Sequence, residues 1–106
     1  MEIREFTNST TGVITIEIHG DLDLYAGIKA SDAMLHAISN ASCQVHVDLQ
    51  NVSYLDSTGV GAIIKALQFA KIKNIVLSFS GIQGTPRKVL AMANILPLLR
   101  EIDKGV

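Results

Sequence analysis

The side chains best suited to chemistry lie in two short stretches, the tripeptide Asp56-Ser57-Thr58 and the pair Asp21 and Asp23. A serine hydroxyl can act as a nucleophile, accept a phosphate or cap a helix, and clustered carboxylates can bind a divalent cation. Each of these chemistries depends on where the two stretches lie relative to each other. The secondary structure around them therefore decides which chemistry is open to the chain.

Hydrophobic periodicity predicts a chain of alternating strands and helices. Ile14, Ile16 and Ile18 alternate with polar residues, which is the period-2 pattern of a strand with one buried face. The spacing of apolar residues then changes to three and four, which is typical of a helix. The predicted strands cover residues 3–6, 13–20, 44–49 and 75–79, and the predicted helices cover 24–41, a segment from about Thr58, one from Pro86 with Thr85 as its N-cap, and a short one from Pro97 to Gly105.

The order of these elements predicts the fold class. We expect a single α/β domain over residues 1–106, with a mixed, largely parallel sheet, an N-terminal antiparallel strand, and helices packed on it. In such sheets, functional groups gather beyond the carboxyl ends of the strands. Asp21, Asp23 and the Asp56-Ser57 pair come after two of those ends, so we expect them on one edge of the molecule.

Composition argues against several classes of function. The 106 residues are 48% hydrophobic with a net charge of -1 and no Lys/Arg cluster, so nucleic acid is not an expected partner. No apolar run approaches the roughly 18 residues that span a bilayer, and the charged N-terminus is unlike a signal peptide. The single cysteine, Cys43, cannot form an internal disulfide. We expect a cytoplasmic monomer that uses no cofactor and contacts no membrane.

The segment from Asp56 to Gly61 opens a predicted helix and carries the strongest functional signal. Asp, Ser and Thr all suit N-cap positions, because each side-chain oxygen can accept a backbone N–H at a helix start. Gly59 and Gly61 each cost about 1 kcal/mol relative to alanine in the first turns of a helix. Capping does not explain that cost, and we expect another molecule's backbone to approach closely here.

Two motifs resemble the STAS family of bacterial anti-sigma factor antagonists. The segment Asp56-Ser57-Thr58-Gly59-Val60-Gly61 is similar to the family's signature, and Gly20-Asp21-Leu22-Asp23 is similar to its Gly-(Asp/Glu)-Leu-Asp element. The spacing of the motifs and the order of the elements match along nearly the whole chain. The chain departs from the family after Ala93, because Asn94-Ile95 replaces Gly-Leu and the last helix is shorter.

The resemblance implies a regulatory protein and not an enzyme. In the family, an anti-sigma factor that is also a serine kinase phosphorylates the serine after the aspartate, which corresponds to Ser57. The unmodified protein binds that anti-sigma factor and so frees a sigma factor for transcription, and a metal-dependent serine phosphatase reverses the modification. The family's aspartate near the phosphosite corresponds to Asp23. We therefore expect a partner-binding edge made of Asp21, Asp23, Asp56, Ser57, Thr58, Gly59 and Gly61.

Other interpretations stay open. STAS domains also serve as accessory modules of transporters or of stress-sensing assemblies, and some members have been suggested to bind nucleotides. The aspartates could instead form the Mg²⁺ pocket of a small phosphotransfer enzyme, although no lysine or full ligand set accompanies them. We expect Asp23 rather to cap the helix that starts at Leu24. No motif links Ser57 to a histidine base. His19, His36 and His46 are dispersed, and we expect structural or solvent-facing roles for them and a buried position for Cys43.

Overall fold

The computed structural model describes residues 1–102 and has the predicted order of elements as far as the last helix. The predicted strands and the first two long helices are confirmed, with ends shifted by one or two residues. The elements are β1 (Glu2–Thr7), β2 (Ile14–His19), α1 (Leu24–Asn40), β3 (Gln44–Asn51), α2 (Ser57–Lys73), β4 (Val76–Ser80), α3 (Gly84–Met92), a 3-10 turn (Leu96–Leu98) and β5 (Arg100–Glu101).

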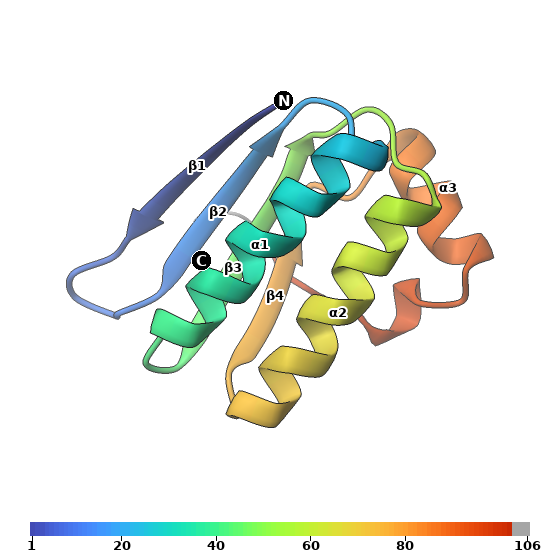
Figure 1. Ribbon diagram of the computed structural model, residues 1–106. Coiled ribbons are helices and arrows are strands. Elements are labelled where there is room, and N and C mark those ends of the chain that lie inside the picture. Colours follow the sequence, from blue (N-terminus) through green and yellow to red (C-terminus); the bar gives the residue numbers. More distant parts are fainter. Residues whose placement is uncertain (103–106) are drawn as a thin grey trace.

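The sheet has the strand order β1-β2-β3-β4-β5, with β1 antiparallel to β2 and the other neighbours parallel. Helices α1 and α2 lie side by side across one face of this sheet (Figure 1). Ile14, Ile16 and Ile18 of β2 are buried in the core between the sheet and these helices. The mixed α/β class is confirmed, and β2 and β3 deliver the loops before α1 and α2 to the same edge.

The start of α3 differs from the prediction. The helix begins at Gly84, with Gln83 in the N-cap position and no side-chain cap, so the predicted cap at Thr85 is wrong. Gly84 has a φ of +61°, a left-handed conformation that favours glycine. Pro86 is buried in the first turn, where its missing N–H removes no helical hydrogen bond. A glycine turn, and not a side-chain cap, therefore sets where α3 begins.

The predicted helix from Pro97 is also wrong. Residues 96–98 form a 3-10 turn, and residues 100–101 add a fifth strand beside β4. Ile95 and Leu99 are buried on either side of the turn, so the chain bends back along the sheet to bury both. The predicted end of that helix, Gly105, lies outside the described residues.

The departure from the family pattern after Ala93 preserves the end of α3. Asn94 has a φ of +61°, the left-handed conformation that a glycine adopts after a helix. Its N–H donates to the Ala91 carbonyl at 3.0 Å, and the Ile95 N–H donates to the Leu90 carbonyl at 3.2 Å. Asparagine tolerates this conformation better than most residues, so it can replace glycine here.

Candidate functional site

The loops before α1 and α2 lie side by side and are joined by backbone hydrogen bonds. The Leu22 N–H donates to the Tyr54 carbonyl at 2.9 Å, and the Asp56 N–H donates to the Leu22 carbonyl at 3.4 Å. Leu22 and Leu55 form a parallel bridge between the loops, and both side chains are buried. The structure thus brings the two stretches of acidic and hydroxyl side chains together at one edge of the sheet.

Asp23 and Asp56 cap the two helices that begin at this edge. The Ala26 N–H donates to Asp23 Oδ1 at 3.0 Å, so the predicted cap of α1 by Asp23 is confirmed. Asp56 Oδ1 accepts two backbone N–H groups, from Thr58 at 2.9 Å and from Gly59 at 3.4 Å. The two carboxylates therefore fix the starts of neighbouring helices and place the first residues of both on the same edge.

Gly59 and Gly61 have different surroundings. A methyl group on Gly59 would lie 2.9 Å from Leu55 Cγ and 3.0 Å from the Leu22 carbonyl oxygen. Gly59 is buried, and the packing of the two loops accounts for it, so an approaching molecule is not needed to explain it. Gly61 is exposed, and a methyl group there would meet nothing within 4 Å beyond its chain neighbours and the nearby backbone of α2. The expected approach of another molecule stays a prediction at Gly61.

Ser57 and Thr58 are adjacent but not equivalent. Ser57 is the first residue of α2 and is exposed. Thr58 is half-buried, and its Cγ2 methyl would lie only 2.7 Å from a Cβ on Gly27 of α1. The Ser57 hydroxyl is therefore open to solvent, whereas Thr58 packs between the helices. Gly27 was not identified from the sequence, although a glycine inside a helix that costs stability is a usable signal of close packing.

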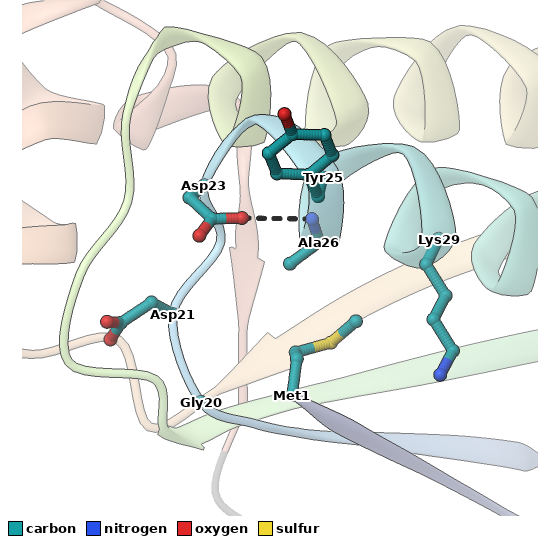
Figure 2. Close-up of a pocket in the computed structure, with 7 residues that line it drawn as sticks. All are labelled: Met1, Gly20, Asp21, Asp23, Tyr25, Ala26 and Lys29. Atoms are coloured by element: carbon teal, nitrogen blue, oxygen red, sulfur yellow. Dashed lines mark hydrogen bonds between the residues drawn. The ribbon is translucent and has the colours of Figure 1, made fainter.

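Asp21 links the two loops through its side chain. Ser53 Oγ donates to Asp21 Oδ1 at 3.1 Å, and both residues are exposed. Figure 2 shows Asp21 and Asp23 at one side of an open hollow of about 580 Å³, with Tyr25 and Lys29 of α1 along its wall. Ser53 is a further residue that the sequence did not single out, since its only signal is its place in the loop before Asp56.

A second hollow lies between α1 and α2, beside Thr58. It has a volume of about 360 Å³ and opens at the surface. Its lining is formed by Gly27, Ile28, Ser31 and Asp32 of α1 and by Thr58, Gly61, Ala62 and Lys65 of α2. Ser57 lines neither hollow, but the next residue, Thr58, lines the second one.

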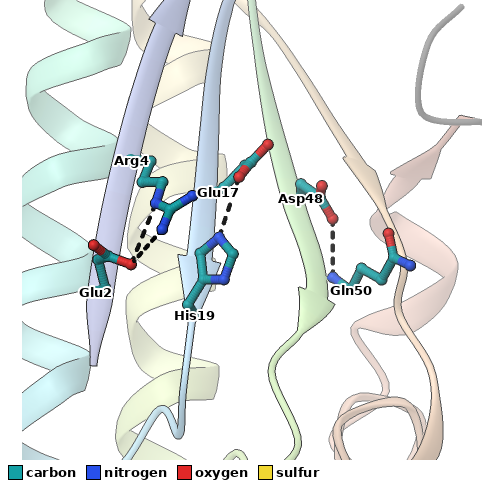
Figure 3. Close-up of polar contacts among 6 residues, drawn as sticks. All are labelled: Glu2, Arg4, Glu17, His19, Asp48 and Gln50. Atoms are coloured by element: carbon teal, nitrogen blue, oxygen red, sulfur yellow. Dashed lines mark hydrogen bonds and ion pairs between the residues drawn. The ribbon is translucent and has the colours of Figure 1, made fainter.

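The three histidines take the structural or solvent-facing positions expected of them. His46 is buried on β3, with its ring nitrogens 2.7 Å from Ser78 Oγ and 2.8 Å from Ser80 Oγ. His19 pairs with Glu17 at 3.1 Å on the sheet face that α1 and α2 leave open (Figure 3). Exposed His36 contacts the side chain of Asn40.

Cys43 differs from its predicted burial. It is exposed, and its thiol donates a weak hydrogen bond to the Thr11 carbonyl at 3.8 Å. The residue precedes β3, which begins at Gln44, so it lies beyond the end of the buried strand.

Within residues 1–102, no group of three His, Cys, Asp or Glu side chains is placed to hold a metal ion together. Asp21, Asp23 and Asp56 share an edge, but two of them are occupied as helix caps. The same part of the chain contains no helix that is both long and apolar enough to cross a membrane.

Known proteins share both the sequence pattern and the fold. The anti-sigma-B factor antagonist of Staphylococcus aureus (strain NCTC 8325) is 30% identical over 90 residues, which cover 85% of this chain and 82% of that protein. The antagonist of Staphylococcus epidermidis is 34% identical over 53 residues, so the match spans 50% of this chain and about half (49%) of that relative.

Solved structures of the anti-sigma factor antagonist SpoIIAA have the same fold. The unphosphorylated form has a TM-score of 0.78 at 19% identity, over 97% of this chain and 90% of that one. The phosphorylated form, described as a Bacillus cell fate determinant, has a TM-score of 0.71 at 19% identity, over 97% and 93% of the two chains. The STAS domain profile matches residues 7–105 of this sequence. The joined loops, the Asp-Ser-Thr-Gly helix start and this match together establish that the chain belongs to the STAS-domain family.

Proposed function

We propose that this chain is an anti-sigma factor antagonist whose binding is switched by phosphorylation of Ser57. With Ser57 unmodified, it binds an anti-sigma factor that is also a serine kinase, and a sigma factor is released for transcription. A serine phosphatase restores the binding form. The observation that carries the proposal is the exposed Ser57 hydroxyl at the first position of α2, directly after the Asp56 cap.

The similar proteins support this proposal. The Staphylococcus relatives are named anti-sigma-B factor antagonists, and SpoIIAA is known in an unphosphorylated and a phosphorylated form. The helix start that carries Ser57 belongs to the matched part of the chain. We therefore extend both the antagonist role and the modification to this protein.

The fold should tolerate a phosphate on Ser57. A phosphate carries roughly -1.5 to -2 charges at neutral pH, and the N-terminus of the 17-residue helix α2 favours negative charge. Ser57 is exposed, so the phosphate stays hydrated and no buried contact is lost. Asp56 keeps its hydrogen bonds to Thr58 and Gly59, because these involve other backbone groups. Modification should therefore leave the domain folded.

The same phosphate should lower the affinity for the partner, although it leaves the fold intact. The edge already carries Asp21, Asp23 and Asp56, so a partner surface that fits the neutral serine meets a strongly negative group. Desolvation and like-charge repulsion of an unpaired dianion would cost about 3 to 5 kcal/mol. That cost corresponds to an affinity reduced by a factor of roughly a few hundred to a few thousand.

The choice of Ser57 over Thr58 rests on the family's register, in which the serine directly after the aspartate is modified, and packing supports it. Thr58 is half-buried and its methyl group lies against Gly27 of α1, whereas Ser57 is exposed. Ser57 is therefore the more accessible of the two residues. Incubation with the kinase and ATP should add one phosphate, and mass spectrometry should find it on Ser57. Phosphate on Thr58 alone would contradict the proposal.

The test of the function is a pull-down from the native cytoplasm with wild type and Ser57→Asp, and then titration calorimetry with the purified kinase. Wild type and Ser57→Ala should bind, Ser57→Ala should resist release by ATP, and Ser57→Asp should bind weakly. Ser39→Asp is the matched control, because Ser39 is exposed near the opposite end of α1. Equal affinities for wild type, Ser57→Ala and Ser57→Asp would remove Ser57 from the interface.

A further inference from the structure

The outer side of strand β1 pairs with no other strand in the described part of the chain, residues 1–102. In the sheet order β1-β2-β3-β4-β5, β1 lies at the edge and is bonded to β2 alone. Apart from Thr7, it lies before the residues 7–105 that the STAS profile matches. A free strand edge offers a row of backbone N–H and C=O groups to a further strand.

The free backbone groups of β1 belong to its odd-numbered residues. Just beyond the strand, the Asn8 N–H donates to the Val13 carbonyl at 2.9 Å, in the same register as the pairs of β1 with β2. Hydrogen-bonded and non-hydrogen-bonded pairs alternate along an antiparallel ladder. The even-numbered residues of β1 therefore bond to β2. The residues that direct their N–H and C=O groups to the free edge are Ile3, Glu5 and Thr7.

The charges on β1 match a second copy of the same strand. If a two-fold axis perpendicular to the sheet pairs β1 antiparallel with itself, residues of the same face lie opposite each other. A pairing centred on Ile3 sets Glu2 of each copy opposite Arg4 of the other. Centring on Arg4 would set two arginines together, and centring on Glu5 two glutamates, which is destabilising. The Ile3-centred register is the one that places opposite charges opposite each other, and it does so twice.

Glu2 and Arg4 are available for this contact on the sheet face that α1 and α2 leave open. They form an ion pair at 3.0 Å within the chain, and their side chains are 60% and 54% exposed (Figure 3). A second copy in the Ile3-centred register would complete an alternating cluster of two carboxylates and two guanidinium groups. Surface ion pairs contribute more in such a network than singly.

A further charge match lies on the sheet face that carries α1. In the same register, Glu5 of one copy lies opposite Met1 of the other. Met1 and Lys29 both line the open hollow of about 580 Å³, and Figure 2 shows Lys29 on the opposite side of Met1 from Asp21 and Asp23. The ion pairs described within residues 1–102 involve neither Glu5 nor Lys29. Glu5 of the second copy therefore arrives on the lysine side of the hollow.

We propose that two copies of this chain associate in solution through their β1 strands, antiparallel and centred on Ile3. The two sheets then form one continuous sheet, with Glu2 and Arg4 paired across one face and Glu5 beside Lys29 on the other. A contact of this length buries less than the roughly 1,200 Å² of a standard complex, so the dimer is weak and forms at about 0.1 to 1 mM protein. It replaces the monomer expected from the sequence and does not depend on Ser57 or on the kinase.

The test is sedimentation velocity of the purified chain over a concentration series up to about 1 mM. Wild type should shift toward the mass of a dimer. Arg4→Glu and Glu2→Arg should each dimerise at least about tenfold more weakly, because each sets like charges opposite each other twice. An equimolar mixture of the two variants should associate again, since every cross-strand pair then joins an arginine to a glutamate. The ion pair within a chain cannot produce this rescue, because each variant has like charges at positions 2 and 4.

Two matched controls identify the edge and the register. Lys88→Glu makes a reversal of charge like that of Arg4→Glu at an exposed position of α3, and Phe6→Ala removes the half-exposed aromatic ring of β1 outside the Ile3-centred overlap. Both should dimerise like wild type, and thermal melts should show all variants folded, since the substituted side chains are exposed. Monomeric wild type at 1 mM, a mixture that stays monomeric, or a loss of dimer with either control would overturn the proposal.

Discussion

The starts of α1 and α2 use the same capping device and differ in the residues next to the cap. Each helix begins after an aspartate whose side chain accepts backbone N–H groups, Asp23 in one and Asp56 in the other. After Asp23 come two exposed apolar residues, Leu24 and Tyr25, which present a constant surface. After Asp56 comes Ser57, a small exposed hydroxyl that is the proposed phosphorylation site. One helix start suits steady contact and the other suits regulation.

The two helix starts also pack against each other, and a substitution in this contact should cause the largest loss of stability. Gly59→Ala should destabilise the protein by about 1 to 3 kcal/mol, because the added methyl group meets the Leu22 carbonyl and Leu55 Cγ. A carbonyl held by its own hydrogen bond cannot move aside easily. Chemical denaturation measures the change in the free energy of unfolding.

Gly61→Ala is the control for this substitution. It lies two residues further along the same helix, where the methyl group enters open space, and it should stabilise the protein by up to about 1 kcal/mol. Equal effects of the two substitutions would mean that the loops do not constrain Gly59.

Removal of either helix cap should cause the next largest loss of stability. Asp56→Ala should cost about 1 to 2 kcal/mol, and Asp23→Ala about 1 kcal/mol, since Asp56 accepts two N–H groups and Asp23 accepts one. A domain of this size loses roughly 4 to 8 °C in melting temperature per kcal/mol, so the two melts should be distinguishable. A larger loss of melting temperature for Asp23→Ala would mean that the Asp23 cap contributes more stability than the Asp56 cap, contrary to this prediction.

Asp23 also needs a variant that separates capping from binding. Asp23→Ala removes the cap as well as the charge, so it should not leave the melting temperature at the wild-type value. Asp23→Asn keeps a capping oxygen and removes only the charge. We expect Asp23→Asn to melt near wild type while binding the kinase more weakly. A binding constant equal to that of wild type would place Asp23 outside the interface.

The helix starts at this edge could be predicted from the sequence because local rules and the fold agree there. Alternating isoleucines fixed the face of β2, and an aspartate before an apolar helical pattern marked the start of α1. At α3 the same rule failed at Thr85, because a left-handed Gly84 determines the turn and no side-chain cap forms. The local sequence pattern does not reveal whether a helix begins with a side-chain cap or with a glycine in the left-handed conformation.

Tertiary contacts explain the other differences from prediction. The tail folds as a turn and strand because Ile95 and Leu99 reach the core and β4 offers a free edge. That strand is held to α3 by Arg87, whose guanidinium lies 2.8 Å from Glu101, and this contact raises the pKa of Arg87. Part of the constraint on Gly59 comes from Leu22, which lies far away in the sequence, before α1. None of these partners is visible in a local window of residues.

A substitution on the α1 side of the contact between the helix starts should cost less stability than one on the α2 side. Gly27→Ala places a methyl group 2.7 Å from Thr58 Cγ2, which is the end of a side chain and can rotate away. Alanine is also the better helix former, so the two effects partly offset each other. We expect a free energy of unfolding within about 1 kcal/mol of wild type. A loss as large as that of Gly59→Ala would show that Thr58 cannot move.

Substitution of Ser57 should cause the smallest change in stability. A site that is modified reversibly should contribute little to the free energy of unfolding. Asp56 already supplies the capping oxygen of α2, and Ser57 is exposed at the first helical position. Ser57→Ala should therefore change the free energy of unfolding by less than about 0.5 kcal/mol, the usual scale for surface substitutions away from structural features. A residue that the fold does not need can be modified repeatedly without loss of the domain. Thermal melts of Ser57→Ala beside Asp56→Ala would show the difference directly, and a large loss for Ser57→Ala would mean that the serine holds the helix start.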